Sequence, residues 1–389
     1  MVRQRSESGY ILVTVAALLF ALVGFTALAV DMGTVLSSRT QIQRAADAAA
    51  LAGAFTFNVN PSLTDQPTRA SNQALKTATA NTVMGIAITD AEVTITVVLP
   101  DASINKPAQV TVTIQRTEPT VFAKILDVSG VADKVTAAAE AGTQGTGARC
   151  VKPFFIPNTA LSSKDPCAAE AAGEVILSSN QVTTYASNLI SSGSNQMRVK
   201  PADPHQALAP GDYYEIDIDG GGGGAYTDNI SHCNTTQLVC RNSYDVLTGN
   251  KMGPTIQGVR DLIGQPPTDS YISVGQYQTL TGVSDTSRAL AIAPVWDILT
   301  ADISPWGVGG FCPPPSGTCT DPNPNKNCRK FPGGSNVTVQ IIGFAIVFVE
   351  SVNGGEVRAR LINVLPCGPN PPPGEDAGPF GVPIRLVRK

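Results

Sequence analysis

The chain has 389 residues, of which 15% are charged and 6% aromatic, with a formal net charge of -4. This balance offers no basic stripe for a phosphate backbone, so we expect no nucleic-acid partner. The length allows two or three domains with their own cores, and 36 glycines with 29 prolines favour a loop-rich β protein over much of the chain.

The first predicted element is a membrane span over residues 10–30, a run without a charged side chain. A helix over this run would be about 31 Å long, close to the ~30 Å of a bilayer's hydrocarbon core. Arg3 and Arg5 precede it, so we expect the N-terminus in the cytoplasm and everything after Asp31 on the far side. The chain would then be a single-pass protein that contacts membrane lipid through residues 10–30.

A cleaved signal peptide is the competing interpretation, because Ala27-Leu28-Ala29 has the small-x-small pattern of a cleavage site. The apolar run exceeds the usual ~7–15 residue core of a signal peptide, which favours retention of the span. Cleavage would release the remainder as a secreted adhesin or binding protein.

Residues 31–54 are rich in alanine and contain no proline, so the span is expected to continue as a stalk helix. Small residues recur on it at four-residue steps and form two adjacent strips: Ala45, Ala49 and Gly53, and beside them Ala46, Ala50 and Ala54. Such spacing lets another helix approach closely. Two interpretations stay open: the strips dock a partner protein, or they pack on the chain's own domain.

Residues 55–145 predict a small α+β module. Its expected elements are a helix over 70–84, a hairpin of strands over 91–99 and 108–115, a second helix over 119–126 and a strand over 133–142. Proline at the start of the second helix and period-two alternation in the strands carry these predictions.

Residues 146–368 predict a β-rich distal domain, and residues 369–389 a Pro/Gly-rich tail whose segment 369–379 is expected to be extended or disordered. Within the domain we expect a short helix over 252–263, buried strands over 289–296 and 337–349, and a hairpin from the latter to 356–364. The fold class is therefore α+β: a transmembrane helix continuing as a stalk, the small module and the β-rich domain.

Eight cysteines all lie in this second half, which predicts disulfides in an oxidising compartment: Cys150, Cys167, Cys233, Cys240, Cys312, Cys319, Cys328 and Cys367. The simplest pairing closes two short loops, Cys233 to Cys240 and Cys312 to Cys319. No C-x-x-C pair is present, so we predict no metal site.

An acidic stretch over 213–219 places Glu215, Asp217 and Asp219 at period two, which suits either a hard cation or a solvated strand face; the second is favoured because no EF-hand pattern accompanies it. No G-x-S-x-G, H-E-x-x-H or Walker motif occurs, so we predict neither a cofactor nor an enzyme. A carboxylate-dependent wall hydrolase remains as an alternative, since it needs only two carboxylates placed by the fold.

Ala29-Val30-Asp31-Met32-Gly33, Arg39 and above all QRAADAAALAGA over residues 43–54 resemble the N-terminal segment of TadG-like proteins of tight-adherence, or Flp pilus, assembly systems. The following module resembles what such proteins carry next. The resemblance covers about the first 145 residues.

The resemblance implies a non-enzymatic anchor or scaffold in the bacterial inner membrane, with its C-terminal bulk in the periplasm or cell envelope and with other pilus-assembly or envelope proteins as partners. A prepilin-peptidase substrate carries glutamate at the fifth residue after its glycine, whereas Thr14 stands there after Gly9. The chain therefore resembles an assembly or anchoring factor rather than a pilus subunit, and the strips of residues 45–54 are expected to dock its partners.

Overall fold

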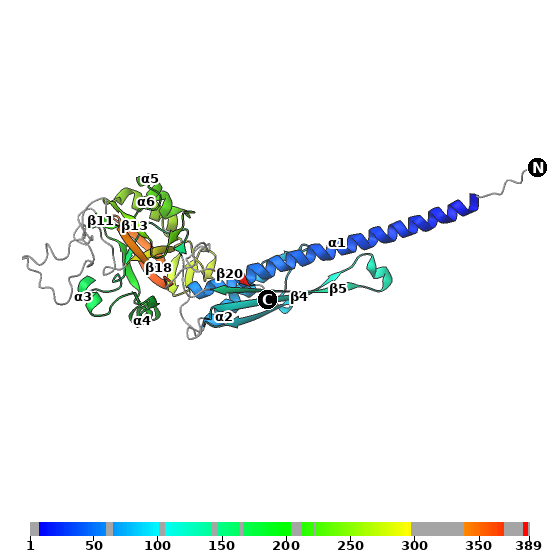
Figure 1. Cartoon of the computed structure of the whole chain (residues 1–389), viewed down its shortest axis with the longest axis horizontal. Coiled ribbons are helices and arrows are strands. Elements are labelled where there is room, and N and C mark those ends of the chain that lie inside the picture. Colours follow the sequence, from blue (N-terminus) through cyan, green and yellow to red (C-terminus); the bar gives the residue numbers. More distant parts are fainter. Residues whose placement is uncertain are drawn as a thin grey trace, which may run out of the picture.

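The computed structural model is a long helical rod with a thin helix-and-sheet module beside its C-terminal half and a larger β-rich domain beyond (Figure 1). It describes residues 8–59, 65–100, 106–141, 147–163, 166–203, 212–220, 222–296, 338–368 and 384–387.

Helix α1 spans Ser8–Val59, 52 residues without a break. At 1.5 Å per residue it is about 78 Å long, more than twice the thickness of a hydrocarbon core. The prediction that the span continues as a stalk helix is confirmed. No proline interrupts the sequence between Met1 and Val59, so nothing in it stops the backbone ladder.

The stalk module consists of the C-terminal part of α1, the helix α2 and a four-stranded antiparallel sheet in the order β20-β5-β4-β3. Their bounds are α2 Gln66–Thr79, β3 Val93–Val98, β4 Ala108–Pro119, β5 Gly130–Ala141 and β20 Ile384–Val387. Between α2 and β3 lie the two-residue strands β1 (Thr82–Val83) and β2 (Ile86–Ala87) and the 3-10 turn η1 (Asp90–Glu92). Helix α1 contacts α2, β4, β5 and β20, so the core is the layer between helices and sheet.

The predicted hairpin of β3 and β4 is confirmed, with Val93 opposite Ile114 and Val98 opposite Gln109. The second predicted helix, over 119–126, is shorter than expected: Pro119 ends β4, and the 3-10 helix η3 (Ala123–Leu126) follows. Pairing of β4 with β5 runs without interruption to Pro119 opposite Gly130. Proline at the last position of a strand leaves the rest of the ladder intact, so the pairing overrides the helix-start signal.

Strand β20 lies inside the predicted tail, beyond the segment 369–379 that is expected to be extended or disordered. Ile384 pairs with Ala141 and Val387 with Ala138, so the end of the chain completes the sheet of the N-terminal module. The tail's residues 369–383 lie outside the described part. A pairing between strands so far apart in sequence leaves no local pattern that would have predicted it.

The distal domain is built on a sheet in the order β10-β19-β18-β13-β11, to which β17 and β7 add through β18. The strands are β7 Ile156–Pro157, β10 Gln196–Lys200, β11 Asp212–Ile216, β13 Ser243–Thr248, β17 Leu290–Trp296, β18 Thr338–Asn353 and β19 Glu356–Pro366. The predicted hairpin of β18 and β19 is confirmed. Its turn uses Gly354 and Gly355 at φ 56° and 87°, values that glycine adopts without strain.

Helices and small ribbons complete the distal domain. They are α3 Pro166–Ala171, α4 Thr184–Ser192, α5 Gly223–Ser231, α6 Met252–Ile263, β6 Gly147–Ala148, β8 Leu177–Ser178, β9 Gln181–Val182, β12 Leu238–Val239, β14 Ser270–Ser273, β15 Gln276–Thr279 and β16 Gly282–Ser284. Among them, α6, α4, β14 and β9 contact strands β18 or β19 of the sheet. Helix α6 has the predicted bounds. Every residue of β17 is buried, as expected of its continuous apolar run.

Arg69 of α2 joins the stalk module to the distal domain. Its Nη1 donates to the carbonyl oxygen of Gly275 at 2.6 Å and lies 3.5 Å from a carboxylate oxygen of Asp285. The guanidinium is mostly buried at this junction. A planar donor held by a carbonyl and a carboxylate fixes the direction in which the distal domain leaves the stalk.

Candidate functional site

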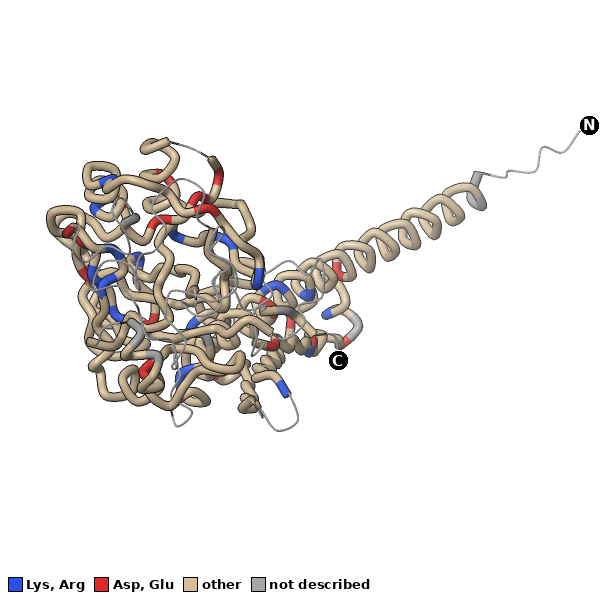
Figure 2. The backbone as a smooth tube through the Cα atoms, turned by 60° about the vertical axis from the view of Figure 1, so that its left-hand side comes forward, with Lys and Arg blue, Asp and Glu red and all other residues tan. Residues whose placement is uncertain are grey.

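The N-terminal half of α1 is apolar and uncovered. Phe20 is 83% exposed and Phe25 74% exposed. Charged residues mark the rest of the chain but are missing from this part of the helix (Figure 2). Within the described residues, α1 is the one helix long and apolar enough to cross a membrane. So large an apolar surface on a single helix is stable in lipid and costly in water.

Asp31 is the first charged residue after the apolar run, and it is buried against the loop between β4 and β5. One carboxylate oxygen accepts the backbone N–H of Val121 at 2.9 Å, and the other accepts those of Phe122 at 3.0 Å and Ala123 at 2.5 Å. Three donors at the start of the η3 turn satisfy the carboxylate and favour its ionised form. The stalk helix is thereby fixed to the tip of the hairpin at the point where the apolar run ends.

Further polar contacts follow along the stalk. Arg39 lies 3.8 Å from a carboxylate oxygen of the buried Asp133 of β5. Gln43 donates to Asp47 at 2.8 Å along the helix, both side chains being half-buried. The helix therefore contacts the sheet through charged side chains near the end of the apolar run and through apolar packing closer to its C-terminus.

The two strips of small residues are buried inside the stalk module. Ala45, Ala46, Ala49, Ala50 and Ala54 are each at most 1% exposed. A Cβ built on Gly53 would lie 3.1 Å from the Cβ of Ala74 and 3.0 Å from the carbonyl oxygen of Ala70, both on α2. The close helix approach that the spacing predicts is therefore made by α2 of the same chain.

This burial corrects the expectation that the strips of residues 45–54 dock partner proteins. Ala70, Ala74 and Ala78 of α2 recur at the same four-residue step and are fully buried. Two alanine-faced helices bring their backbones together while both of them also contact the sheet. A partner would have to displace α2 to reach the strips, so the interpretation that they pack on their own domain holds.

The acidic stretch over 213–219 does not form one carboxylate face. Strand β11 ends at Ile216, and Tyr214 within it has φ 63°, which breaks the alternation. Glu215 is fully buried, whereas Asp217 accepts the backbone N–H of Gly220 at 2.6 Å and Asp219 accepts the hydroxyl of Thr236 at 2.8 Å. No group of three metal-ligating side chains occurs among the described residues.

Glu215 instead lies at the centre of a buried charge cluster. Lys200 Nζ, also fully buried, is 3.2 Å from one carboxylate oxygen, and Lys251 Nζ is 3.3 Å from the other. Lys200 also donates to Asn250 at 2.9 Å and lies over the ring of Tyr213. Burial raises the pKa of Glu215 against the pull of both lysines, and burial lowers the pKa of Lys200 against the pull of Glu215.

This cluster ties β10, β11 and the start of α6 together. Desolvation governs both pKa shifts, so the cluster specifies an arrangement of strands at a high desolvation cost. A carboxylate neutralised by two lysines also differs from the pair of facing carboxylates that glycoside hydrolysis uses.

The disulfides differ from the predicted local pairing. Cys150 is bonded to Cys233 and Cys240 to Cys367, over separations of 83 and 127 residues. Cys233 therefore does not close a short loop with Cys240. The reason is the fold: β6, which precedes Cys150, pairs with β12, which precedes Cys240, and Cys367 follows β19. Cys312, Cys319 and Cys328 lie outside the described residues, and of Cys167 only the backbone in α3 is described.

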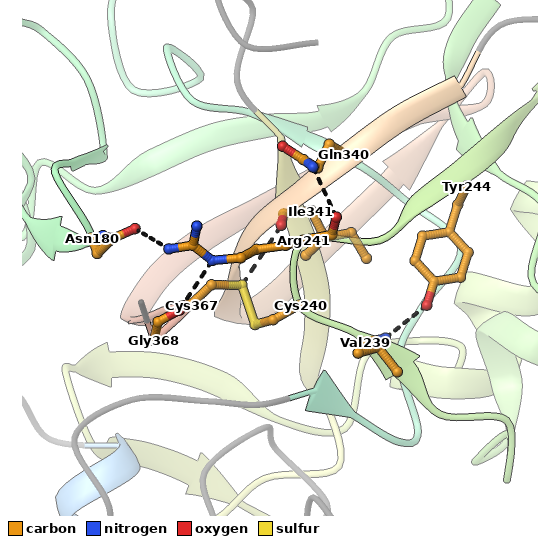
Figure 3. The surroundings of a disulfide bond; sticks show 9 residues. All are labelled: Asn180, Val239, Cys240, Arg241, Tyr244, Gln340, Ile341, Cys367 and Gly368. Atoms are coloured by element: carbon orange, nitrogen blue, oxygen red, sulfur yellow. Dashed lines mark hydrogen bonds between the residues drawn. A yellow bond between two sulfur atoms is a disulfide. The ribbon is translucent and has the colours of Figure 1, made fainter. Parts of the chain in front are cut away.

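The surroundings of the Cys240–Cys367 bond form a polar clamp at the end of the main sheet (Figure 3). Arg241 donates from Nε to the carbonyl oxygen of Gly368 at 3.0 Å and from Nη2 to Asn180 at 2.9 Å. Its own carbonyl oxygen accepts the side-chain amide of Gln340 at 2.8 Å. The disulfide and this arginine together fix the point from which the chain leaves toward β20.

Two functional residues were missed by sequence reasoning. Asp31 stood in the quoted segment Ala29–Gly33 without a role, although a lone carboxylate directly after a span is a signal that something must satisfy it. Lys200 carried no signal at all, because its partner Glu215 lies on another strand.

The architecture defines a class: a chain with one exposed apolar N-terminal helix that continues into a compact α+β module and carries a disulfide-bonded distal domain. Residues 9–55 match the family model described as "Tad: Putative Flp pilus-assembly TadE/G-like". The matched segment contains the apolar run, Asp31 and both strips of small residues, and it bears out the resemblance of the N-terminal segment. No curated protein and no solved structure showed a significant match to the chain.

Proposed function

We propose that this chain is a non-enzymatic, membrane-anchored component of Flp pilus assembly, which acts as an anchor or scaffold for other proteins of the envelope. The observation that carries the proposal is the division of α1 within the family-matched segment. Its first half exposes apolar side chains around the helix, and its second half is the core helix of the stalk module.

In the proposed orientation the N-terminus is cytoplasmic and the distal domain lies in the periplasm. Arg3 and Arg5 before the span support this direction through the positive-inside rule. The two disulfides support it independently, because the periplasm permits such bonds and the cytosol disfavours them. The distal domain and the outer surface of the stalk sheet would then face the partners, since the strips of residues 45–54 are occupied.

The alternative is a secreted adhesin or binding protein released by cleavage after Ala29. The helix runs through this site without a break, and Asp31, two residues later, is bound to the hairpin tip. A peptidase needs an extended segment, so cleavage there would require the helix to open. Both features favour a retained anchor.

The test compares two forms of the chain in a strain that lacks its gene. One is the wild type, and the other replaces residues 8–29 by an efficiently cleaved signal peptide, so that the same bulk reaches the periplasm without an anchor. An anchor or scaffold predicts pili with the first form and none with the second, although the second accumulates. Pili of normal number with the released form would contradict the proposal and favour the secreted protein.

Fractionation adds a direct readout to the same strains. The proposal expects wild-type chain of full-length mass in the membrane pellet after an alkaline wash. A shortened soluble chain that begins at Val30 would contradict it. An assay of wall glycans with the purified full-length protein addresses the hydrolase alternative, and release of glycan fragments would contradict the non-enzymatic role.

A further inference from the structure

The tip of the β4–β5 hairpin is an apolar surface without a protein covering. The hairpin runs beside α1 toward the helix's N-terminal half and ends in a loop that turns through η3 (Figure 1). On this loop Ile125 is 82% exposed, Val121 63%, Val128 45% and Phe122 40%. We name Val121, Phe122, Ile125 and Val128 the hairpin tip.

The position of the hairpin tip along α1 is fixed by Asp31. The carboxylate of Asp31 accepts the backbone N–H groups of Val121, Phe122 and Ala123 at distances between 2.5 and 3.2 Å. Asp31 directly follows the apolar run of residues 10–30. The hairpin tip therefore lies at the level where the hydrocarbon core of a bilayer around that run would end.

We propose that the hairpin tip inserts its apolar side chains into the headgroup region of the same membrane that α1 crosses. The inference rests on the proposed function, because it needs α1 in a bilayer. Amphipathic segments at a membrane surface bury their apolar side chains about 5–10 Å into the boundary between headgroups and acyl chains. A loop held next to the end of a span reaches that layer without any movement of the stalk.

The neighbouring polar groups fit this layer. Lys124 stands between the apolar residues of the tip and is exposed, so its long side chain can place its ammonium group among lipid phosphates. The backbone N–H groups at the start of the turn are already satisfied by Asp31, which removes the main cost of bringing an irregular loop to the edge of the hydrocarbon. The carboxylate of Asp31 would lie at the edge of the hydrocarbon with its charge satisfied by these backbone N–H groups.

Exposed apolar side chains also continue on α1 past the end of the apolar run. Met32 and Leu36 of α1, next to Asp31 along the helix, are 56% and 57% exposed. Lipid that surrounds residues 10–30 would extend over these side chains and onto the hairpin tip. A helix with one span can rotate and tilt freely, whereas a second contact at the hairpin tip fixes the direction in which the distal domain points.

The experiment uses the full-length protein in vesicles of phosphatidylcholine that carry bromine either near the headgroups or deep in the acyl chains, since bromine quenches tryptophan at short range. Three variants each add one tryptophan: Ile125→Trp at the hairpin tip, Phe20→Trp in the span and Leu280→Trp in the distal domain, where the side chain is 84% exposed. Emission of the wild type, from Trp296 and Trp306, is subtracted.

The proposal expects Ile125→Trp to lose emission with shallow bromine and less with deep bromine. Phe20→Trp should lose most with deep bromine, and Leu280→Trp should lose none with either. If Ile125→Trp behaves like Leu280→Trp while Phe20→Trp is quenched, the hairpin tip faces water or another protein, which overturns this inference and leaves the anchor intact. If Phe20→Trp is not quenched, the chain has no span, and both the membrane anchor and the insertion of the hairpin tip are rejected.

Discussion

The stalk module and the distal domain are held together by different interactions. In the stalk, alanine and glycine on α1 meet alanine on α2, and this close contact between the two helices depends on small side-chain volume. In the distal domain, a buried glutamate with two lysines and two disulfides over long separations connect strands that are far apart in sequence. The stalk therefore tolerates no added bulk where α1 meets α2, whereas the distal domain depends on a buried charge cluster whose partners balance one another and on its disulfides.

This difference fits the two positions in the proposed anchor. A module at the membrane surface must hold one helix rigidly over its whole length, and close packing along two helix faces does so without a thick core. A domain further out joins strands that are far apart in sequence, so cross-links between them add to the order that its core supplies. The five expected effects that follow separate the two regions, in order of decreasing size.

Replacing Glu215 by alanine should have the largest effect. It leaves Lys200 buried without its anion, and breaking a buried ion pair costs about 3–5 kcal/mol. Thermal unfolding of the purified chain in detergent should show this loss of stability. Hydrogen exchange should locate the lost protection in the distal domain alone.

The matched control for this variant is Lys200→Met combined with Glu215→Leu, which removes both charges and keeps volume. Its stability should return close to that of the wild type, because the desolvation cost disappears together with the pair. A double variant as unstable as Glu215→Ala would contradict the assignment of the loss to an unpaired charge.

Removing the Cys240–Cys367 bond by replacing both residues with serine should cost about 2–4 kcal/mol, since the bond closes a long loop of the unfolded chain. Differential scanning calorimetry checks it. A reductant should lower the unfolding temperature of the distal domain in the same way. Exchange protection of α1 and α2 should not change, because all eight cysteines lie at or beyond Cys150.

The buried Lys152 should make the stability of the distal domain depend on pH. Burial lowers its pKa to about 8 from 10.5, opposed by Asp228, while its Nζ donates to the carbonyl oxygen of His232. The folded chain then binds fewer protons than the unfolded chain between these values, so the free energy of unfolding rises with pH from 8 toward 10.5, by at most about 3 kcal/mol. Urea titrations of the wild type and of Lys152→Met across this range measure it. An equal slope in both would contradict the cause.

Gly53→Ala and Gly33→Ala test the packing of the stalk as a pair. Both gain helix propensity of up to about 1 kcal/mol. A Cβ on Gly53 would approach Val110 Cγ1 to 2.9 Å, so overpacking by about 1–3 kcal/mol should make this variant less stable. Nothing lies within 4 Å of a Cβ on Gly33, so this variant should keep the gain. Thermal unfolding followed by helix circular dichroism checks both, and equal shifts would show that Gly53 is not closely packed against β4 and α2.

Asp31→Asn should have the smallest and most local effect. The amide has one acceptor oxygen in place of the carboxylate's two, and it lacks the charge that three N–H groups now enclose. Hydrogen exchange at Val121 to Ala123 should accelerate several-fold, while protection of β4 and β5 away from the tip is retained. Unchanged exchange at these amides would mean that Asp31 does not hold the hairpin.

The sequence predicted those elements whose signal is local. The apolar run of α1, the alternation in β3 and β4, the bounds of α6 and the glycine turn between β18 and β19 all lie within short windows. Features that join distant segments could not be predicted in this way: β20 beside β5, Cys240 bonded to Cys367, and Glu215 facing Lys200.

The predictions for Pro119 and for the strips of residues 45–54 differ from the structure for the same reason. Pro119 indicated a helix start, but pairing with β5 draws it into a strand. The strips of residues 45–54 indicated a close helix contact, which exists, but composition alone does not say whether the second helix belongs to this chain or to another. In both cases a tertiary contact, which the local pattern does not contain, decided the outcome.

The central claim is that α1 crosses a membrane and places the distal domain outside the cytosol. Fusing alkaline phosphatase after Lys389 in one strain and green fluorescent protein there in another tests it most directly, because the first is active only outside the cytosol and the second fluoresces within it. The account predicts an active phosphatase bound to the membrane and a dark fluorescent protein. An inactive phosphatase with a fluorescent partner fusion would contradict it.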